Sequence, residues 1–146
     1  MIIRKANQKE TDFILNFSQE VIEEGSMGYL KPSRDNIISE VFKPALENGA
    51  YYLVAEKENT LLGWILVGTN IDLYSFEEIG YLLDIYVFSP YRKSGIAKEL
   101  TQEALKRLKQ GHYKKVQLSI FSGNHSTALC QQFGFKEILT VFERPL

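Results

Sequence analysis

The segment between Pro90 and Ala97 has the residue types of an anion-binding turn. Pro90 cannot continue a strand ladder, so a strand ends before it. Gly95 and Ala97 are small and let a ligand approach the main chain, and the first N–H groups of a following helix have no partner inside that helix. With Arg92 and Lys93 beside them, these donors predict a phosphate site. A tight, solvated turn without a ligand is the alternative.

Two carboxylates in the strand expected before this turn could move a proton. Asp84 lies in the middle of an apolar run, and burial raises a carboxyl pKa toward the range that suits a general base. A structural aspartate that bonds to the backbone or to an arginine is an equal alternative. Strand alternation places Asp84 on one face with Leu82, Tyr86 and Glu78. Glu78 is therefore a second candidate base, acting through water.

The composition is that of an ordinary globular chain and excludes several classes of protein. The chain has 146 residues, of which 45% are hydrophobic, and a net charge of −1, so it has no strong field to attract nucleic acid or membrane. Cys130 is the only cysteine, which excludes an intrachain disulfide and a cysteine-rich metal site. No signal-peptide pattern and no run of about 20 apolar residues is found. We expect a soluble, cytoplasmic protein.

Hydrophobic periodicity and turn residues predict alternating strands and helices along the chain. Strands are expected at residues 2–5, 51–57, 61–69, 79–88, 116–121 and 135–142. Helices are expected from a cap at Asn7 or Thr11 to Ile22, from Ser33 to Pro44, and over residues 94–110 and 126–133. Gly25 and Gly28 interrupt the first helical pattern.

This order of elements indicates one domain over residues 1–146 of the α/β (α+β) class. The short links between the strands at 51–57, 61–69 and 79–88 make these three antiparallel. The strand–helix–strand connections that follow imply parallel pairing with right-handed crossovers. We expect a mixed, mainly antiparallel central sheet of six to seven strands, flanked by about four helices.

Three motifs in this order resemble the GNAT (GCN5-related) N-acetyltransferases over essentially the whole chain. The first is the strand 83–87 followed by Arg92-x-x-Gly95-x-Ala97 and a helix. The second is the segment 124–129, which begins with an asparagine and precedes Phe133-Gly134-Phe135. The third is the opening strand 3–6 with the acidic helix that follows it.

The resemblance implies that acetyl-CoA donates an acetyl group to an amine by direct attack, without a metal. The pyrophosphate would be held beside Arg92 by the backbone of Lys93, Ser94, Gly95, Ile96 and Ala97. The pantetheine arm would pair with the backbone of Ile85, Tyr86 and Val87 like an added strand. The N–H group of Tyr86 or Ile85 would polarise the thioester carbonyl, and Asn124 would hydrogen-bond the pantetheine arm.

Two positions depart from the family's pattern. Cys130 stands where many relatives have a tyrosine that protonates the leaving thiolate, and a thiol is a weaker hydrogen-bond donor. A buried, inert cysteine is the alternative role for Cys130. Leu83 stands where some relatives carry a glutamate, which leaves the identity of the base open between Asp84 and Glu78.

The resemblance places the amine acceptor near the first two helices and the middle strands. Tyr29, Tyr74 and Phe76 are the candidate contacts, the last two in a loop over residues 70–78. Acidic and aromatic side chains there suit a cationic amine: a small amine, a polyamine, an amino acid or a protein amine. The alternatives are an acyl-CoA-binding regulatory module with little turnover and an interaction protein without a CoA site. A monomer and a homodimer are both compatible with the sequence.

Overall fold

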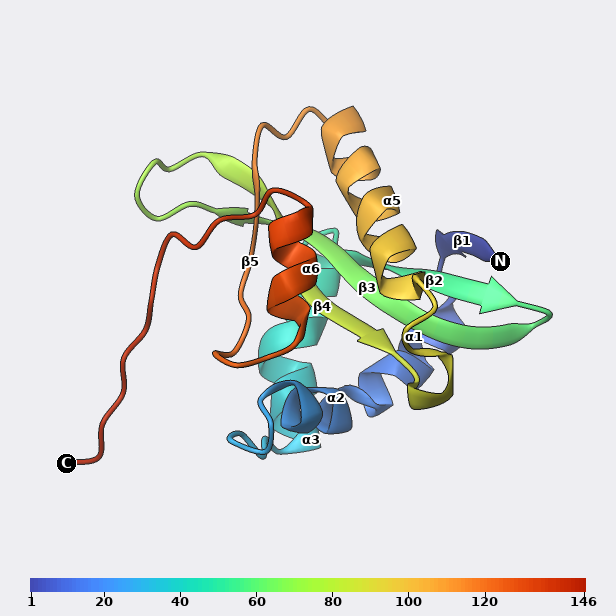
Figure 1. Ribbon diagram of the computed structural model, residues 1–146, viewed down its shortest axis with the longest axis horizontal. Coiled ribbons are helices and arrows are strands. Elements are labelled where there is room, and N and C mark those ends of the chain that lie inside the picture. The colour runs from blue at the N-terminus through green and yellow to red at the C-terminus, as the bar shows by residue number, and fades with distance from the viewer.

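The computed structural model describes all residues from 1 to 146 (Figure 1). The strands are β1 (Ile2–Lys5), β2 (Tyr51–Lys57), β3 (Thr60–Ile71), β4 (Glu78–Val87) and β5 (Val116–Leu118). The helices are α1 (Gln8–Asn16), α2 (Ser18–Gly25), α3 (Arg34–Ile37), a π-helical segment η1 (Ile38–Phe42), α4 (Lys43–Glu47), the 3-10 turn η2 (Ser89–Tyr91), α5 (Ile96–Gln110) and α6 (Ser126–Gln132). Since α3, η1 and α4 follow without a break, the chain has five helices rather than about four.

The strands form one mixed sheet in the order β1-β2-β3-β4-β5. All neighbours are antiparallel except β4 and β5, which are parallel. The expected mixed, mainly antiparallel architecture is confirmed. The expected number of six to seven strands is wrong, because the sheet has five.

The difference lies at the C-terminus, where the strand expected at residues 135–142 is absent. The segment has strand-forming residues, but strand propensity is realised only where a neighbouring strand or a packed face is available. After Gly134 the chain leaves the body of the protein instead and ends at a distance from it (Figure 1). This segment, residues 136–146, is called the tail below.

Helices cover both faces of the sheet, and each face has its own core. On one face, α5 packs on a cluster that contains Ile65 and Leu82. On the other face, α1 and α2 pack on a cluster that contains Ile14, Trp64 and Leu66. We call these the α5 face and the α2 face.

A β-bulge in β4 separates residues that simple alternation would place together. Leu66 pairs with Asp84 and Val67 pairs with Leu82, which leaves Leu83 as the extra residue. Leu82 consequently packs on the α5 face, while the Asp84 side chain bonds to Trp64 on the α2 face. The expectation that Leu82 and Asp84 share a face is wrong, because a bulge inserts one residue into the period.

The edge of β4 that faces β5 is open along its second half. β5 pairs only with residues 80–82, so residues 83–87 have no strand beside them. The Phe88 N–H donates to the Leu62 carbonyl (3.0 Å), and main-chain groups in an antiparallel pair alternate between bonding the partner and pointing away. Hence the groups of Tyr86 bond to β3, and those of Ile85 and Val87 point to the open side.

Candidate functional site

The turn between β4 and α5 carries a run of main-chain donors without acceptors. The N–H groups of the six residues from Lys93 to Lys98 donate no hydrogen bond within the protein. Lys93 (φ 63°) and Gly95 (φ 85°) both have left-handed backbone conformations. Successive N–H groups in such a turn form a concave nest that binds anions, and the N-terminus of the 15-residue helix α5 adds its dipole.

Nothing in the protein fills the space above this nest. No side chain caps α5, whereas α1 has a complete capping box between Asn7 and Glu10. A Cβ atom built on Gly95 would have no heavy atom within 4 Å. Lys93 and Lys98 lie exposed beside the nest and form no ion pair. The turn therefore has the room and the charge for a phosphate group.

The side chains of Ser94, Ile96 and Ala97 contact the protein itself rather than the open space above the nest. The Ser94 hydroxyl donates to the Tyr91 carbonyl, and Ile96 is buried in the α5-face core. Ala97 packs against the same core. What residues 93–97 leave open is therefore the main chain, and the predicted pyrophosphate cradle there stays a prediction.

Arg92 does not point at the nest. Its Nε donates to the Val87 carbonyl (2.8 Å) and its Nη1 donates to the Glu24 carboxylate (2.6 Å). The guanidinium also lies 5.2 Å from the centre of the Tyr86 ring. Arg92 was expected to bind the pyrophosphate, but the structure uses it to fasten the end of β4 to α2.

Asn124 has a similar fastening role. Its Nδ2 donates to the Gly25 carbonyl (2.7 Å) and its Oδ1 accepts from the Ser126 N–H (2.8 Å). Each end of the amide makes one hydrogen bond inside the protein, and the predicted contact with a pantetheine arm stays a prediction. Consecutive residues of α2, Glu24 and Gly25, thus contact the turn after β4 on one side and the loop before α6 on the other.

Asp84 lies next to the open edge of β4 and faces α2. Its Oδ2 accepts a hydrogen bond from Trp64 Nε1 (3.1 Å). The residue is partly exposed along the open edge, while its carboxyl group is enclosed by protein. Burial raises the pKa of Asp84 to about 6, although hydrogen bonds from Trp64 and from the Ile85 backbone oppose the shift. A carboxylate with this pKa can accept and return a proton near neutral pH.

A buried tyrosine lies in the same row of the sheet as Asp84. Tyr52 pairs with Leu66, and Leu66 pairs with Asp84. The Tyr52 hydroxyl is the one enclosed side-chain polar atom without a hydrogen-bond partner. Burial and the charge of Asp84 raise the pKa of Tyr52 far above its ordinary value, so this hydroxyl stays protonated.

Tyr86 contributes its ring to the α2 face and its backbone to β3. The ring packs with Trp64 and Phe17 at centroid distances of 5.2 and 5.6 Å. Burial and the neighbouring Glu24 raise the pKa of the Tyr86 hydroxyl. Of the two N–H groups expected to polarise a carbonyl, the register favours Ile85 over Tyr86, because the Ile85 group points to the open edge.

Glu78 is not near this centre. It begins β4, six residues before Asp84, which corresponds to about 20 Å along a strand. It lies at the end of the strand where the Tyr113 hydroxyl bonds to its carboxylate (3.4 Å). The structure thus brings Asp84 to the open edge of β4 and leaves Glu78 at the opposite end of the strand.

The expected acceptor contacts do not lie together. Tyr74 and Phe76 occupy the turn between β3 and β4, where they are 84% and 79% exposed. This turn lies at the start of β4, and the nest follows its end (Figure 1). Tyr29 follows α2 and is exposed.

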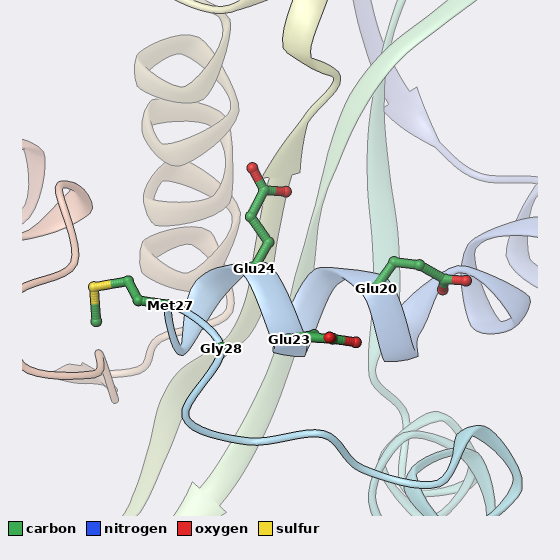
Figure 2. A pocket seen from close by; sticks show the side chains of 5 residues that line it. All are labelled: Glu20, Glu23, Glu24, Met27 and Gly28. Atoms are coloured by element: carbon green, nitrogen blue, oxygen red, sulfur yellow. The ribbon is translucent and has the colours of Figure 1, made fainter.

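An open pocket of about 490 Å³ lies along α2, lined by Glu20, Glu23, Glu24, Met27 and Gly28. Figure 2 shows that Glu24 leaves the helix in a different direction from Glu20 and Glu23. The hydrogen bond from Arg92 lowers the pKa of Glu24 and keeps it charged. The carboxylates therefore make this surface acidic but do not converge on one point.

Cys130 lies on α6 and is partly buried. Burial raises the pKa of its thiol, so the thiol stays protonated at neutral pH. No group of three or more histidine, cysteine or acidic side chains is arranged to hold a metal. None of the helices is long and apolar enough to span a bilayer.

The family model of the "Acetyltransferase (GNAT) family" matches residues 15–135, and the chain belongs to this family. No curated protein sequence matches the chain. Among solved structures, "Putative acetyl transferase from Pyrococcus furiosus" has a TM-score of 0.83 at 22% identity, with 99% of each chain covered.

Two further solved structures have the same fold. The aminoglycoside antibiotic 6'-N-acetyltransferase AAC(6')-IG from Acinetobacter haemolyticus has a TM-score of 0.71 at 20% identity and covers 100% of this chain and 99% of its own. A predicted acetyltransferase from Clostridium acetobutylicum, whose structure contains acetyl-CoA, has a TM-score of 0.74 at 17% identity and covers 99% and 95%. At these identities the likeness shows the fold.

Two contacts of the site escaped the sequence analysis. Glu24 meets Arg92 across 68 residues of sequence, and Trp64 meets Asp84 across 20. No local pattern signals either contact, because each depends on how the strands and α2 pack in space. A single apolar tryptophan next to a strand glycine gives no hint that its indole N–H serves a carboxylate.

Proposed function

We propose that this protein transfers an acetyl group from acetyl-CoA to a primary amine. The observation that carries the proposal is the run of six unpaired N–H groups beside the open edge of β4. A free strand edge followed by an anion-binding nest suits an acyl donor that has an extended arm with amide groups and a pyrophosphate. Membership of the acetyltransferase family supports the same reading.

The protein would bind acetyl-CoA mainly through main-chain groups of its own residues. The N–H groups of residues 93–98 would hold the pyrophosphate, with Lys93 and Lys98 adding charge. The outward groups of Ile85 and the Val87 N–H would pair with the pantetheine arm, since Arg92 already occupies the Val87 carbonyl. Acetyl-CoA would supply the acetyl group as a thioester.

The reaction forms a C–N bond as the C–S bond breaks, and the attacking amine must lose a proton. Asp84 is the residue placed to accept that proton, because its pKa of about 6 leaves it deprotonated at neutral pH. The Ile85 N–H also donates to the Asp84 carboxylate, so it would be shared between that carboxylate and the carbonyl oxygen, where negative charge grows in the transition state. Base and carbonyl donor are adjacent residues at the open edge.

The acceptor would approach from the α2 face, toward which Asp84 points. Glu20 and Glu23 make that surface acidic, which suits an amine with positive charge elsewhere in the molecule. We propose a cationic small amine, polyamine, amino acid or protein amine as the acceptor, with Tyr29 as a contact at the rim. The position of Tyr74 and Phe76 at the far end of β4 argues against a role for them.

A second candidate is an acyl-CoA-binding module with little turnover. The observation that favours it is Cys130, which stands at the position of the usual tyrosine and whose thiol is a poor acid because burial raises its pKa. Release of CoA in the presence of a panel of amines separates the two. Tight binding of acetyl-CoA with no release on any amine would support the module.

The test of the donor site is calorimetry with acetyl-CoA. Gly95→Glu places a carboxylate in the nest and should weaken binding roughly 100-fold or more, because like charges in contact cost several kcal/mol. The matched control is Gly49→Glu, since Gly49 also has a left-handed φ (97°) and nothing within 4 Å of an added Cβ. Unchanged affinity in Gly95→Glu would contradict the assignment.

A further inference from the structure

The open edge of β4 is bounded at both of its ends. Residues 80–82 are paired with β5, and the Val87 carbonyl accepts a hydrogen bond from Arg92 Nε (2.8 Å). Between these limits, the Val87 N–H and both main-chain groups of Ile85 point to the open side. An extended ligand therefore meets a short window of main-chain groups, which a strand closes at one end and an arginine side chain closes at the other.

Arg92 is held at the Val87 carbonyl by two further contacts. Its Nη1 donates to Oε1 of Glu24 on α2 (2.6 Å), and its guanidinium lies 5.2 Å from the centre of the Tyr86 ring. The side chains of Arg92 and Glu24 are 31% and 48% exposed, and an ion pair this exposed stabilises little by itself. The carbonyl, the carboxylate and the ring together therefore hold the guanidinium in one position.

The ion pair also removes Arg92 as a source of charge for the nest. The hydrogen bond from Arg92 lowers the pKa of Glu24, so the carboxylate stays charged at neutral pH and neutralises the guanidinium locally. Lys93 and Lys98 form no ion pair and supply the free charge beside the nest. What Arg92 contributes at this place is therefore its position, which makes the Val87 carbonyl unavailable to a ligand.

A strand edge alone does not fix the register of an extended ligand. Outward main-chain groups recur at every second residue, so a bound arm can shift by two residues, or roughly 6–7 Å, and meet the same kinds of group again. A shift toward the nest would move an amide N–H of the pantetheine arm from the Ile85 carbonyl to the Val87 carbonyl. The thioester carbonyl would move from the Ile85 N–H to the Val87 N–H, where the reacting centre is out of hydrogen-bond reach of Asp84.

We infer that Arg92 is a register stop for the acyl donor, and that Glu24 is the positioning residue that holds this stop in place. With the Val87 carbonyl occupied, a shifted arm would leave one amide N–H without an acceptor, which disfavours the shifted register by roughly tenfold or more. The inference rests on the proposed function and adds the residues that decide where along β4 the acetyl group lies.

The position of the acetyl group can be measured without an acceptor amine. The sharpest probe is acetyl-pantetheine, because it lacks the pyrophosphate with which the nest would anchor acetyl-CoA. Backbone amide spectra of isotope-labelled protein are recorded with pantetheine and with acetyl-pantetheine, and the difference between the two reports the acetyl group alone. In the wild type the largest difference should fall at Ile85. In Glu24→Ala a second difference of comparable size should appear at Val87.

The same pair of spectra with CoA and acetyl-CoA separates a lost register from a damaged fold. The nest is intact in Glu24→Ala, so the second difference at Val87 should be smaller with acetyl-CoA than with acetyl-pantetheine. Calorimetry should give an acetyl-CoA dissociation constant within about threefold of the wild type, because an exposed ion pair contributes little to stability. A damaged fold would instead weaken the binding of both probes alike.

Two matched variants serve as controls. Glu24→Gln keeps an oxygen that accepts from the guanidinium and should restore the single difference at Ile85. Glu103→Ala removes the ion pair of Glu103 with Arg107 (3.0 Å), whose side chains are 28% and 30% exposed, and should also keep the wild-type spectrum. Arg92→Ala removes the stop itself and should give the difference at Val87, which keeps the inference testable if Glu24→Ala fails to fold.

The outcomes separate this inference from the function on which it rests. An acetyl difference at Ile85 alone in both Glu24→Ala and Arg92→Ala would overturn the register stop and leave donor binding in place. The same second difference at Val87 in Glu103→Ala would also overturn it, because the effect would then not depend on the Val87 carbonyl. A wild type that binds neither acetyl-CoA nor acetyl-pantetheine would overturn the proposed function, and this inference with it.

Discussion

The two ends of β4 present opposite parts of the polypeptide to solvent. At its start, the turn of residues 72–77 between β3 and β4 is held by Lys115 and Gln117 and exposes the side chains of Leu73, Tyr74 and Phe76. At its end, Arg92, Ser94 and Ile96 are committed to the fold, and what is left open is a run of main-chain N–H groups flanked by the exposed Lys93 and Lys98.

This contrast separates two kinds of recognition on one strand. Exposed apolar side chains suit another protein surface, where area is buried. A nest of N–H groups suits a small anionic ligand, because it supplies several hydrogen bonds in a small volume. Substitutions at one end should therefore leave the other end's binding unchanged, and this independence can be tested.

The largest effect is expected at Asp84, beside the open edge. Asp84→Asn should lower kcat by about 10²–10⁴-fold, the usual contribution of a general base, while acetyl-CoA affinity stays as it is. In the wild type, activity should fall as the pH drops through about 6, the pKa of Asp84. Steady-state rates from pH 5 to 8 measure both. A full rate for Asp84→Asn would remove Asp84 from the reaction.

The same substitution should stabilise the fold at neutral pH. The folded-state pKa of about 6 lies above the ordinary value for an aspartate, so the folded state binds the proton more tightly and the free energy of unfolding falls as pH rises through this range. Asparagine removes the buried charge and keeps an acceptor for Trp64. Thermal unfolding should show a higher Tm than the wild type at pH 7.5 and a smaller difference at pH 4.

Arg92 and Lys115 are cations that form ion pairs near the two opposite ends of β4. Arg92→Ala removes the donors to Val87 and Glu24 and should weaken acetyl-CoA binding about tenfold by loosening the turn, at a cost of roughly 1–3 kcal/mol in stability. Lys115→Ala removes the ion pairs with Asp72 and Glu77 and should leave acetyl-CoA binding unchanged. Calorimetry with acetyl-CoA on both variants measures the comparison, and equal losses of donor affinity would contradict it.

A smaller effect is expected from the free cations at the nest. Lys93→Gln and Lys98→Gln should each weaken acetyl-CoA binding by about 0.3–1 kcal/mol at low salt, the usual size for a charge near a helix end. The loss should shrink as the ionic strength rises. Titrations at two salt concentrations test this, and a large, salt-independent loss would mean that a lysine side chain, not the backbone, holds the anion.

The smallest effect is expected at Tyr52. Tyr52→Phe removes the buried hydroxyl that has no partner, so stability should change by less than about 1 kcal/mol and in the stabilising direction. Tyr51→Phe, which leaves its neighbour's buried hydroxyl in place, is the control. A clear loss of stability in Tyr52→Phe would indicate that the hydroxyl bonds to an ordered water between it and Asp84.

The sequence predicted the parts of this fold that depend on local patterns. Hydrophobic periodicity predicts the strand 51–57 and the helix after Gly95. Residues with special backbone freedom predict the turn before that helix. What it could not predict depends on packing at a distance. The bulge at Leu83 reverses the face of Asp84, and the ion pair of Arg92 with Glu24 takes the arginine away from the nest.

The tail illustrates a different limit. Its residues form strands readily, and the sequence cannot say whether a strand partner exists in the same chain. The structure answers this with five strands and a free C-terminal segment.

The nest at Lys93 to Lys98 also has an evolutionary consequence. A binding site made of main-chain donors depends little on the side chains of its residues, so most substitutions there leave the donors in place. What must be inherited is the course of the chain, fixed by the left-handed residues Lys93 and Gly95. The fold itself is shared with a solved structure at 22% identity, which is compatible with a site that depends on the course of the chain more than on its side chains.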